Sequence, residues 1–170
     1  MKEIIISADS GLPFTWIDFS QPTIEELNIV AREYHLHEYT VRDSLEPDHL
    51  PKFESLDTVN FLITRVYAPK NQRNPHTIQE LTSKIAIFYN TSFIITIHRQ
   101  PQPFIFQIRD SCIESKKCRT PNELITHILW NSLHTYEAPA LELAKSIDFY
   151  EDEIFLKDRV PNIQPESLLF

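Results

Sequence analysis

An α+β fold is what the sequence predicts: a central mixed sheet flanked by short helices, in an α/β/α arrangement, with long helices at the C-terminus. Residues 1–118 contain strand-like segments and short helical segments, whereas over residues 119–160 the apolar residues recur mainly at helical spacing. The content of 42% hydrophobic and 24% charged residues is ordinary for a globular protein. We therefore expect a sheet-rich core over 1–118, long helices packing on it over 119–160, and a tail over 161–170.

The N-terminal part of the chain alternates between strand and helix signals. Lys2–Ser7 and Phe14–Phe19 are short apolar segments that predict two strands. A helix is expected to begin at Thr23, because Thr23 and Glu26 can form a capping box that satisfies free backbone donors. A second short helix is predicted over Thr40–Leu45.

The centre of the chain predicts most of the sheet. Four segments are rich in β-branched and aromatic residues and are expected to be strands: Lys52–Ser55, Val59–Tyr67, Leu81–Tyr89 and Phe93–His98. The polar segment Pro69–His76 should be a loop. Asn90–Ser92 separates the last two strands and predicts a hairpin turn, although it also reads as a glycosylation sequon.

The C-terminal third predicts helices. Phe104–Lys117 has helical spacing, and a new helix should begin at Thr120, where an N-cap residue precedes a proline and a capping-box glutamate. Pro139 is expected to kink or divide the following run. Helical spacing then continues to Pro161.

Composition excludes several classes of function. Gly11 is the single glycine, so neither a P-loop nor a dinucleotide-binding loop can be present, because both need several glycines. The formal net charge of −8 repels phosphate backbones, so no nucleic-acid partner is expected. The most apolar stretch, Ile85–Ile97, is only about half the length that spans a bilayer.

Cysteines and histidines give weak signals of metal or redox chemistry. Cys112 and Cys118 have five residues between them, which is not the spacing of a zinc knuckle or redox pair, and we expect free thiols in a reducing compartment. His35 and His37 do not share a helix face, yet together with His49 they leave a zinc site open as an alternative.

Three stretches of the chain resemble the soluble domain of CorA-type magnesium and divalent-cation transporters. They contain Thr15-Trp16-Ile17-Asp18, then Val41–Leu45 with His49–Glu54, then Ile85–Arg99, and the resemblance covers roughly residues 14–156. It implies a non-catalytic, ion-sensing domain on the cytoplasmic face of the inner membrane. It also implies a homopentamer whose regulatory ion is weakly bound Mg²⁺, with Co²⁺, Ni²⁺ or Zn²⁺ as alternatives, and no catalytic or cofactor-binding residue.

The pore motif Gly-Met-Asn of these transporters is missing here, since Met1 and Gly11 are the only methionine and glycine. We therefore expect a piece of a longer protein that lacks the transmembrane pore and the stalk leading to it. Two alternatives stay open. The chain could be a stand-alone soluble binding module that shares the fold, or it could belong to a zinc-exporting or zinc-importing member of the family.

Asp43 is the candidate metal ligand. The resemblance places it at the last acid of a "Leu-Glu-Asp" turn, which in the family helps to bind a divalent ion between neighbouring subunits. Mg²⁺ keeps most of its waters and needs only one or two carboxylates, which suits a shared site. Arg42 stands where the family often has glutamate, and this arginine could weaken the site or pair with Asp43. Other acids are expected mainly to be solvated: Glu46, Asp48, Asp148, Glu151, Asp152 and Glu153.

Overall fold

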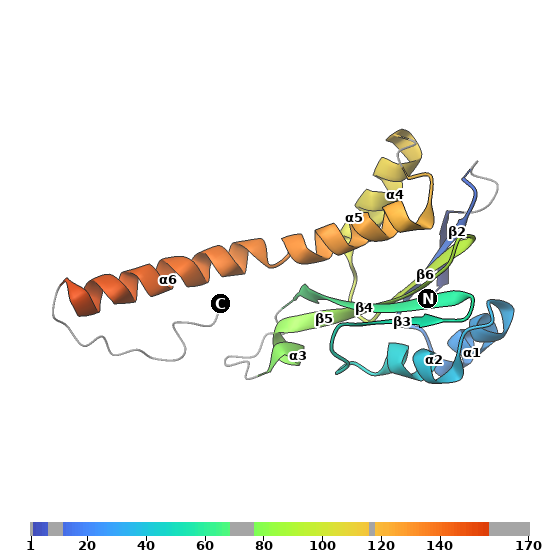
Figure 1. The fold of residues 1–170 in the computed structure, drawn as a ribbon, viewed down its shortest axis with the longest axis horizontal. Coiled ribbons are helices and arrows are strands. Elements are labelled where there is room, and N and C mark those ends of the chain that lie inside the picture. Colours follow the sequence, from blue (N-terminus) through green and yellow to red (C-terminus); the bar gives the residue numbers. More distant parts are fainter. Residues whose placement is uncertain (1, 7–11, 69–76, 116–117, 157–170) are drawn as a thin grey trace.

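The computed structural model describes residues 2–6, 12–68, 77–115 and 118–156. Its central element is a six-stranded mixed sheet with the strand order β1-β2-β6-β5-β4-β3 (Figure 1). The strands are β1 (Lys2–Ile6), β2 (Thr15–Ser20), β3 (Lys52–Leu56), β4 (Val59–Tyr67), β5 (Thr82–Tyr89) and β6 (Phe93–His98). The helices are α1 (Ile24–Glu33), α2 (Glu38–Leu45), α3 (Ile78–Leu81), α4 (Pro103–Ser115), α5 (Pro121–His134) and α6 (Glu137–Phe155).

The predicted fold class is confirmed, and each predicted strand lies within two residues of its observed bounds. Every neighbouring pair of strands is antiparallel except β2 and β6, which run parallel with Trp16 opposite Ile94 and Ser20 opposite His98. Asn90 makes the predicted turn between β5 and β6, because its Oδ1 accepts from the backbone N–H groups of Ser92 and Phe93 at 2.8 and 3.1 Å. The loop and tail expected over Pro69–His76 and 161–170 lie outside the described residues.

Helices cover both faces of the sheet, so the domain has three layers (Figure 1). On one face α1 and α2 bury Leu27, Val30 and Val41 against alternate sheet residues such as Phe61 and Phe88. On the other face α4 and α5 pack against the intervening sheet residues. That second cluster includes Trp16, Ile85, Ile94, Ile105, Leu124 and Ile128. Side chains that alternate along a strand point to opposite faces, so each strand supplies both cores.

The capping boxes begin their helices as predicted. Thr23 Oγ1 accepts from the Glu26 N–H at 3.2 Å and Glu26 accepts from the Thr23 N–H at 2.9 Å. The same reciprocal pair forms at Thr120 and Glu123. The long C-terminal run is divided between α5 and α6, and Pro139 lies in the first turn of α6, where a missing N–H costs no helical hydrogen bond.

The two C-terminal helices differ in burial. α5 contributes Leu124, Ile125 and Ile128 to the core, whereas no residue of α6 is buried. Figure 1 shows α6 extending away from the sheet. Large apolar side chains are exposed along it: Leu141, Leu143, Ile147, Phe149, Ile154 and Phe155.

The expectation of two free thiols is wrong. Cys112 and Cys118 form a disulfide, with their Cα atoms 5.1 Å apart and both residues buried beneath α4 and α5. On one continuous helix, six residues would span about 9 Å along the axis. α4 ends at Ser115 instead, so Cys118 belongs to the connection to α5 and comes within bonding distance.

Candidate functional site

Asp43 lies in the last turn of α2, and its side chain is 18% exposed. Its two carboxylate oxygens have different partners. Lys52 Nζ lies 2.5 Å from Oδ2, and His49 Nε2 lies 3.1 Å from Oδ1. A cation that bound this carboxylate would therefore replace contacts that already exist within the same chain.

The surroundings of Asp43 keep its carboxylate ionised. Partial burial raises the pKa of Asp43, but the hydrogen bond and charge of Lys52, together with those of His49, outweigh burial and hold the pKa below its ordinary value. The pKa of Lys52 is raised because its hydrogen bonds to Asp43 and Glu54 outweigh the opposite effect of its burial. Asp43 is therefore in the charged form that a divalent cation binds.

Lys52 links Asp43 to a second acid. Its Nζ also lies 2.8 Å from Glu54 Oε1, and Glu54 Oε2 accepts from the Tyr39 hydroxyl at 2.8 Å. Lys52 and Glu54 are two residues apart on β3, so both side chains lie on the side of the strand that faces α2. The alternation of charged and apolar residues over Lys52–Glu54 is a sequence signal for such a charged network, beyond the signal that pointed to Asp43.

Arg42 does not pair with Asp43, contrary to one possibility raised by the sequence. Its guanidinium lies 3.8 Å from Glu38, one helical turn earlier on α2, and both side chains are exposed. Adjacent helix positions point in different directions, which explains why Arg42 faces away from the Asp43 carboxylate.

The other candidate residues do not assemble a metal centre within the described part of the chain. Among those residues, no group of three or more histidine, cysteine, aspartate or glutamate side chains is placed to hold an ion. His37 caps α2 without a side-chain hydrogen bond, His35 has a left-handed backbone (φ 53°), and His49 contacts Asp43. The backbone carbonyls of Glu46 and Asp48 accept hydrogen bonds from Lys84 and Gln79.

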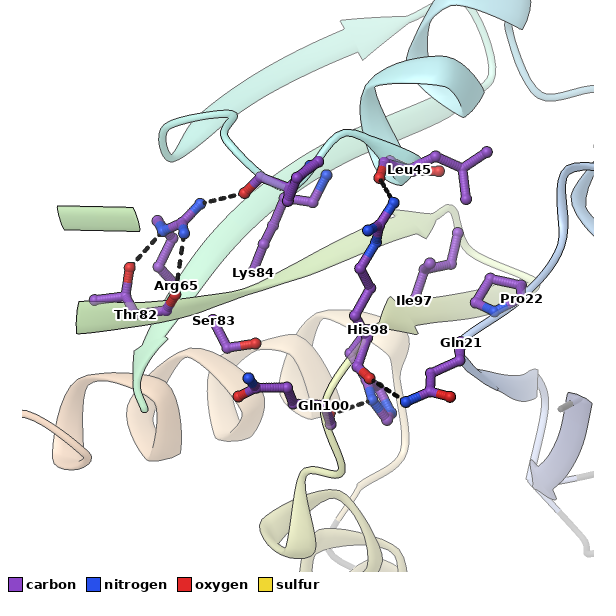
Figure 2. A pocket seen from close by; sticks show the side chains of 13 residues that line it. Gln21, Pro22, Leu45, Arg65, Thr82, Ser83, Lys84, Ile97, His98 and Gln100 are labelled. Atoms are coloured by element: carbon purple, nitrogen blue, oxygen red, sulfur yellow. Dashed lines mark hydrogen bonds between the residues drawn. The ribbon is translucent and has the colours of Figure 1, made fainter. Parts of the chain in front are cut away.

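Three cations hold the C-terminal end of α2 in place. Lys84 Nζ donates to the backbone carbonyls of Asp43, at 2.6 Å, and of Glu46. Arg65 donates to two carbonyls in the segment that follows α2, at 3.0 and 2.8 Å, and Arg99 donates to the last carbonyl of the helix at 2.7 Å. Positive charge is favourable beside these carbonyls, because the helix dipole is negative at this end. Figure 2 shows Arg65 and Lys84 reaching toward this segment from neighbouring strands.

A second aspartate–histidine pair lies on the opposite face of the sheet. His98 Nε2 lies 2.9 Å from Asp18 Oδ2, and the side chains are 3% and 4% exposed. Thr96 donates to the other oxygen of Asp18 and accepts from Trp16 Nε1 at 3.1 Å. His98 Nδ1 lies 2.7 Å from the Gln100 carbonyl, which can only accept, so this nitrogen carries a proton. Every polar group of this pair is therefore engaged inside the protein.

Comparison with known families identifies the class of protein. The model of the CorA-like Mg²⁺ transporter protein family matches residues 12–166, and the chain therefore belongs to this family. No helix in the described ranges is both long and apolar enough to cross a membrane.

Individual relatives agree with this assignment. A putative metal ion transporter of Bacillus subtilis, YfjQ, is 24% identical over 95 residues, which are 56% of this chain and 27% of the relative. The chain therefore spans about a quarter of the length of that curated relative.

Solved structures share the fold at low sequence identity. The ZntB cytoplasmic domain of Vibrio parahaemolyticus matches with a TM-score of 0.64 at 20% identity, over 81% of this chain and 55% of that one. The soluble domain of CorA from Methanocaldococcus jannaschii matches with a TM-score of 0.58 at 20% identity, and the match covers 91% of this chain and 64% of that one. Full-length CmaX matches with a TM-score of 0.67 at 15% identity, and the match covers 87% of this chain and 44% of that one.

Proposed function

We propose that this chain is the cytoplasmic ion-sensing domain of a divalent-cation transporter, in which Asp43 supplies one carboxylate of a regulatory Mg²⁺ site shared between subunits. Family membership supports the transporter role. The placement of Asp43 supports the site, because its carboxylate is ionised, partly exposed and held at the end of a helix that buried cations anchor. The domain itself has no catalytic role.

The regulatory step follows from electrostatics. An ion between two carboxylates cancels their repulsion and holds neighbouring subunits together, whereas the empty site lets them separate. In this chain Lys52 and His49 take the place of the ion at Asp43. Mg²⁺ must compete with them, so binding should be weak and should depend on the second subunit.

The test is Mg²⁺-dependent protection from proteolysis in the full-length, assembled protein. Asp43→Asn should raise the Mg²⁺ concentration needed for protection by about tenfold, because the ion loses one charged ligand. Lys52→Met should lower that concentration, since it frees one oxygen of Asp43. Asp57→Asn is the matched control, because it removes the same charge at the exposed turn between β3 and β4. If Asp43→Asn and Asp57→Asn needed the same Mg²⁺ concentration for half-maximal protection, the proposed metal site at Asp43 would be refuted.

Zn²⁺ is a second candidate ion for the same position. The specific observation is the 3.1 Å contact between His49 Nε2 and Asp43, since zinc accepts both imidazole and carboxylate ligands whereas Mg²⁺ prefers oxygen. If Zn²⁺ is the physiological ion, His49→Ala should weaken Zn²⁺ binding and leave Mg²⁺ binding unchanged or tighter. Unchanged Zn²⁺ binding in His49→Ala would instead favour the first proposal. Co²⁺ and Ni²⁺ belong in the same titration.

Self-association of the full-length protein is part of this proposal, and we infer a homopentamer on the cytoplasmic face of the inner membrane. The exposed apolar side chains of α6 support self-association, because a second copy of the chain could cover part of this apolar area. Sedimentation of the 170-residue chain should show monomers or weak oligomers, with the remaining assembly energy supplied by membrane helices and a stalk.

A further inference from the structure

A pocket of about 520 Å³ lies beside the C-terminal end of α2. Gln21 and Pro22 before α1 form one wall, and Leu45 at the end of α2 forms another (Figure 2). The floor comes from the ends of β4, β5 and β6. Arg65 and Lys84 lie on the sheet face that carries α1 and α2, since they continue the alternation of the buried residues on that face.

The lining of this pocket is cationic. Arg65, Lys84 and Arg99 contribute to it, whereas none of its 13 lining residues is an aspartate or glutamate. Arg65 and Lys84 are only 5% and 8% exposed. None of the ion pairs found in the described ranges includes any of the three cations. Positive charge is thus concentrated here although the whole chain carries −8.

Carbonyl oxygens orient these cations but do not neutralise them. The two carbonyl bonds of Lys84, to Asp43 and Glu46, account for two of its three N–H groups within the described residues. The pKa of Lys84 is lowered to about 8, mainly by burial and also by the neighbouring charges of Arg99 and Arg65, which outweigh the opposite effect of Asp43 and Glu46. Arg99 is exposed at the mouth, so a ligand can reach its guanidinium. An anion in the pocket would relieve this repulsion.

We propose that this pocket binds a phosphate monoester, with the phosphate between Lys84 and Arg99 and the organic part against Pro22, Leu45 and Ile97. Arginine and lysine together are typical phosphate ligands. The volume lies within the range of about 300–1,000 Å³ that small-molecule sites have, and it leaves room for a sugar or nucleoside beside the phosphate. Side chains hold the phosphate here, which agrees with a sequence that lacks a glycine-rich loop.

Calorimetric titration of the 170-residue chain, without divalent cations, tests this proposal independently of the Asp43 metal site. The probes are ribose 5-phosphate, adenosine 5′-monophosphate, and adenosine, which lacks the phosphate. We expect saturable binding of a phosphate ester and none of adenosine. Tighter binding of the sugar phosphate or of the nucleotide supports the proposal in either case and identifies the organic part.

Two substitutions locate the binding site. Arg99→Gln should weaken binding by about tenfold, because it removes a charged donor at the mouth without disturbing the core. Lys84→Met should abolish binding, provided that circular dichroism shows a folded protein. Lys145→Gln is the matched control, since Lys145 is an exposed cation on α6 that pairs with Glu142. The proposal is overturned if no phosphate ester saturates the chain, if adenosine binds as well as its phosphate, or if Arg99→Gln and Lys145→Gln bind equally.

Discussion

Two aspartate–histidine pairs in this domain have nearly the same contact distance and opposite surroundings. His98 lies 2.9 Å from Asp18 with both side chains under 5% exposed, and His49 lies 3.1 Å from Asp43 with side chains 35% and 18% exposed. The buried pair is completed by Thr96, whereas the surface pair is completed by the long side chain of Lys52. Distance alone therefore does not distinguish a structural pair from an exchangeable one.

Burial decides which of the two pairs can accept an ion. Asp18 contacts groups that are fixed by the sheet, and its side chain is only 4% exposed, so a hydrated cation would have to displace buried partners to bind it. Asp43 contacts two side chains that can swing into solvent when a cation or a second subunit replaces them. The same two residue types thus stabilise the core in one place and, in the other, form an accessible pair at the position where we propose that an ion binds.

The largest expected effect is the loss of stability in Asp18→Ala. This change leaves the imidazole of His98 and the hydroxyl of Thr96 buried without their partner, and such losses cost about 3–5 kcal/mol. Asp43→Ala should cost only about 1 kcal/mol, because its partners regain water. Urea denaturation of both variants measures the difference, and equal losses would contradict the distinction drawn between the pairs.

A smaller effect is expected from Thr96→Val, which preserves shape and removes only the hydroxyl. Asp18 Oδ1 and Trp16 Nε1 both lose a partner, so the free energy of unfolding should fall by about 1–3 kcal/mol. Thr126→Val is a suitable control, since the Thr126 hydroxyl donates to a backbone carbonyl on the exposed side of α5. Should the two valine variants be equally stable, the buried network would contribute nothing beyond packing.

The sequence predicts the elements of this fold better than it predicts either pair. Some signals act over only three or four residues, as do the capping boxes at Thr23 and Thr120 and the turn at Asn90. Such signals can be recognised from the local sequence alone. α3 also begins with a capping box, at Thr77, but four residues are too few to show helical periodicity. Local sequence patterns thus predicted the strands and helices, except for the four-residue helix α3.

The pairs depend on contacts that no local pattern encodes. Asp18 meets His98 across 80 residues because β2 and β6 run parallel, and Lys84 reaches the carbonyl of Asp43 across 41 residues. The resemblance to a family pointed to Asp43 but not to the partners of its carboxylate. The disulfide was missed for a related reason, since it depended on where α4 ends.

The smallest effect, and the one that tests the surface pair most directly, is the acid dependence of stability at Asp43. Its pKa in the folded protein lies below the ordinary value, so its ionised form stabilises the fold at neutral pH. That contribution is complete above the unfolded-state pKa of about 3.9 and is lost as the pH falls through the lower, folded-state pKa. The stability gap between the native chain and Asp43→Asn should therefore close as the pH falls below about 4.

Asp57→Asn separates this effect from general acid denaturation. Asp57 is exposed at the turn between β3 and β4, so its substitution changes the net charge equally without touching Lys52 or His49. Urea titrations at a series of pH values should give a gap of about 1 kcal/mol for Asp43→Asn and a smaller one for Asp57→Asn. A gap for Asp43→Asn that persists undiminished at pH 2 would mean that the carboxylate is not held in its charged form. Asp43 would then lack the charge through which we propose that it binds a divalent ion.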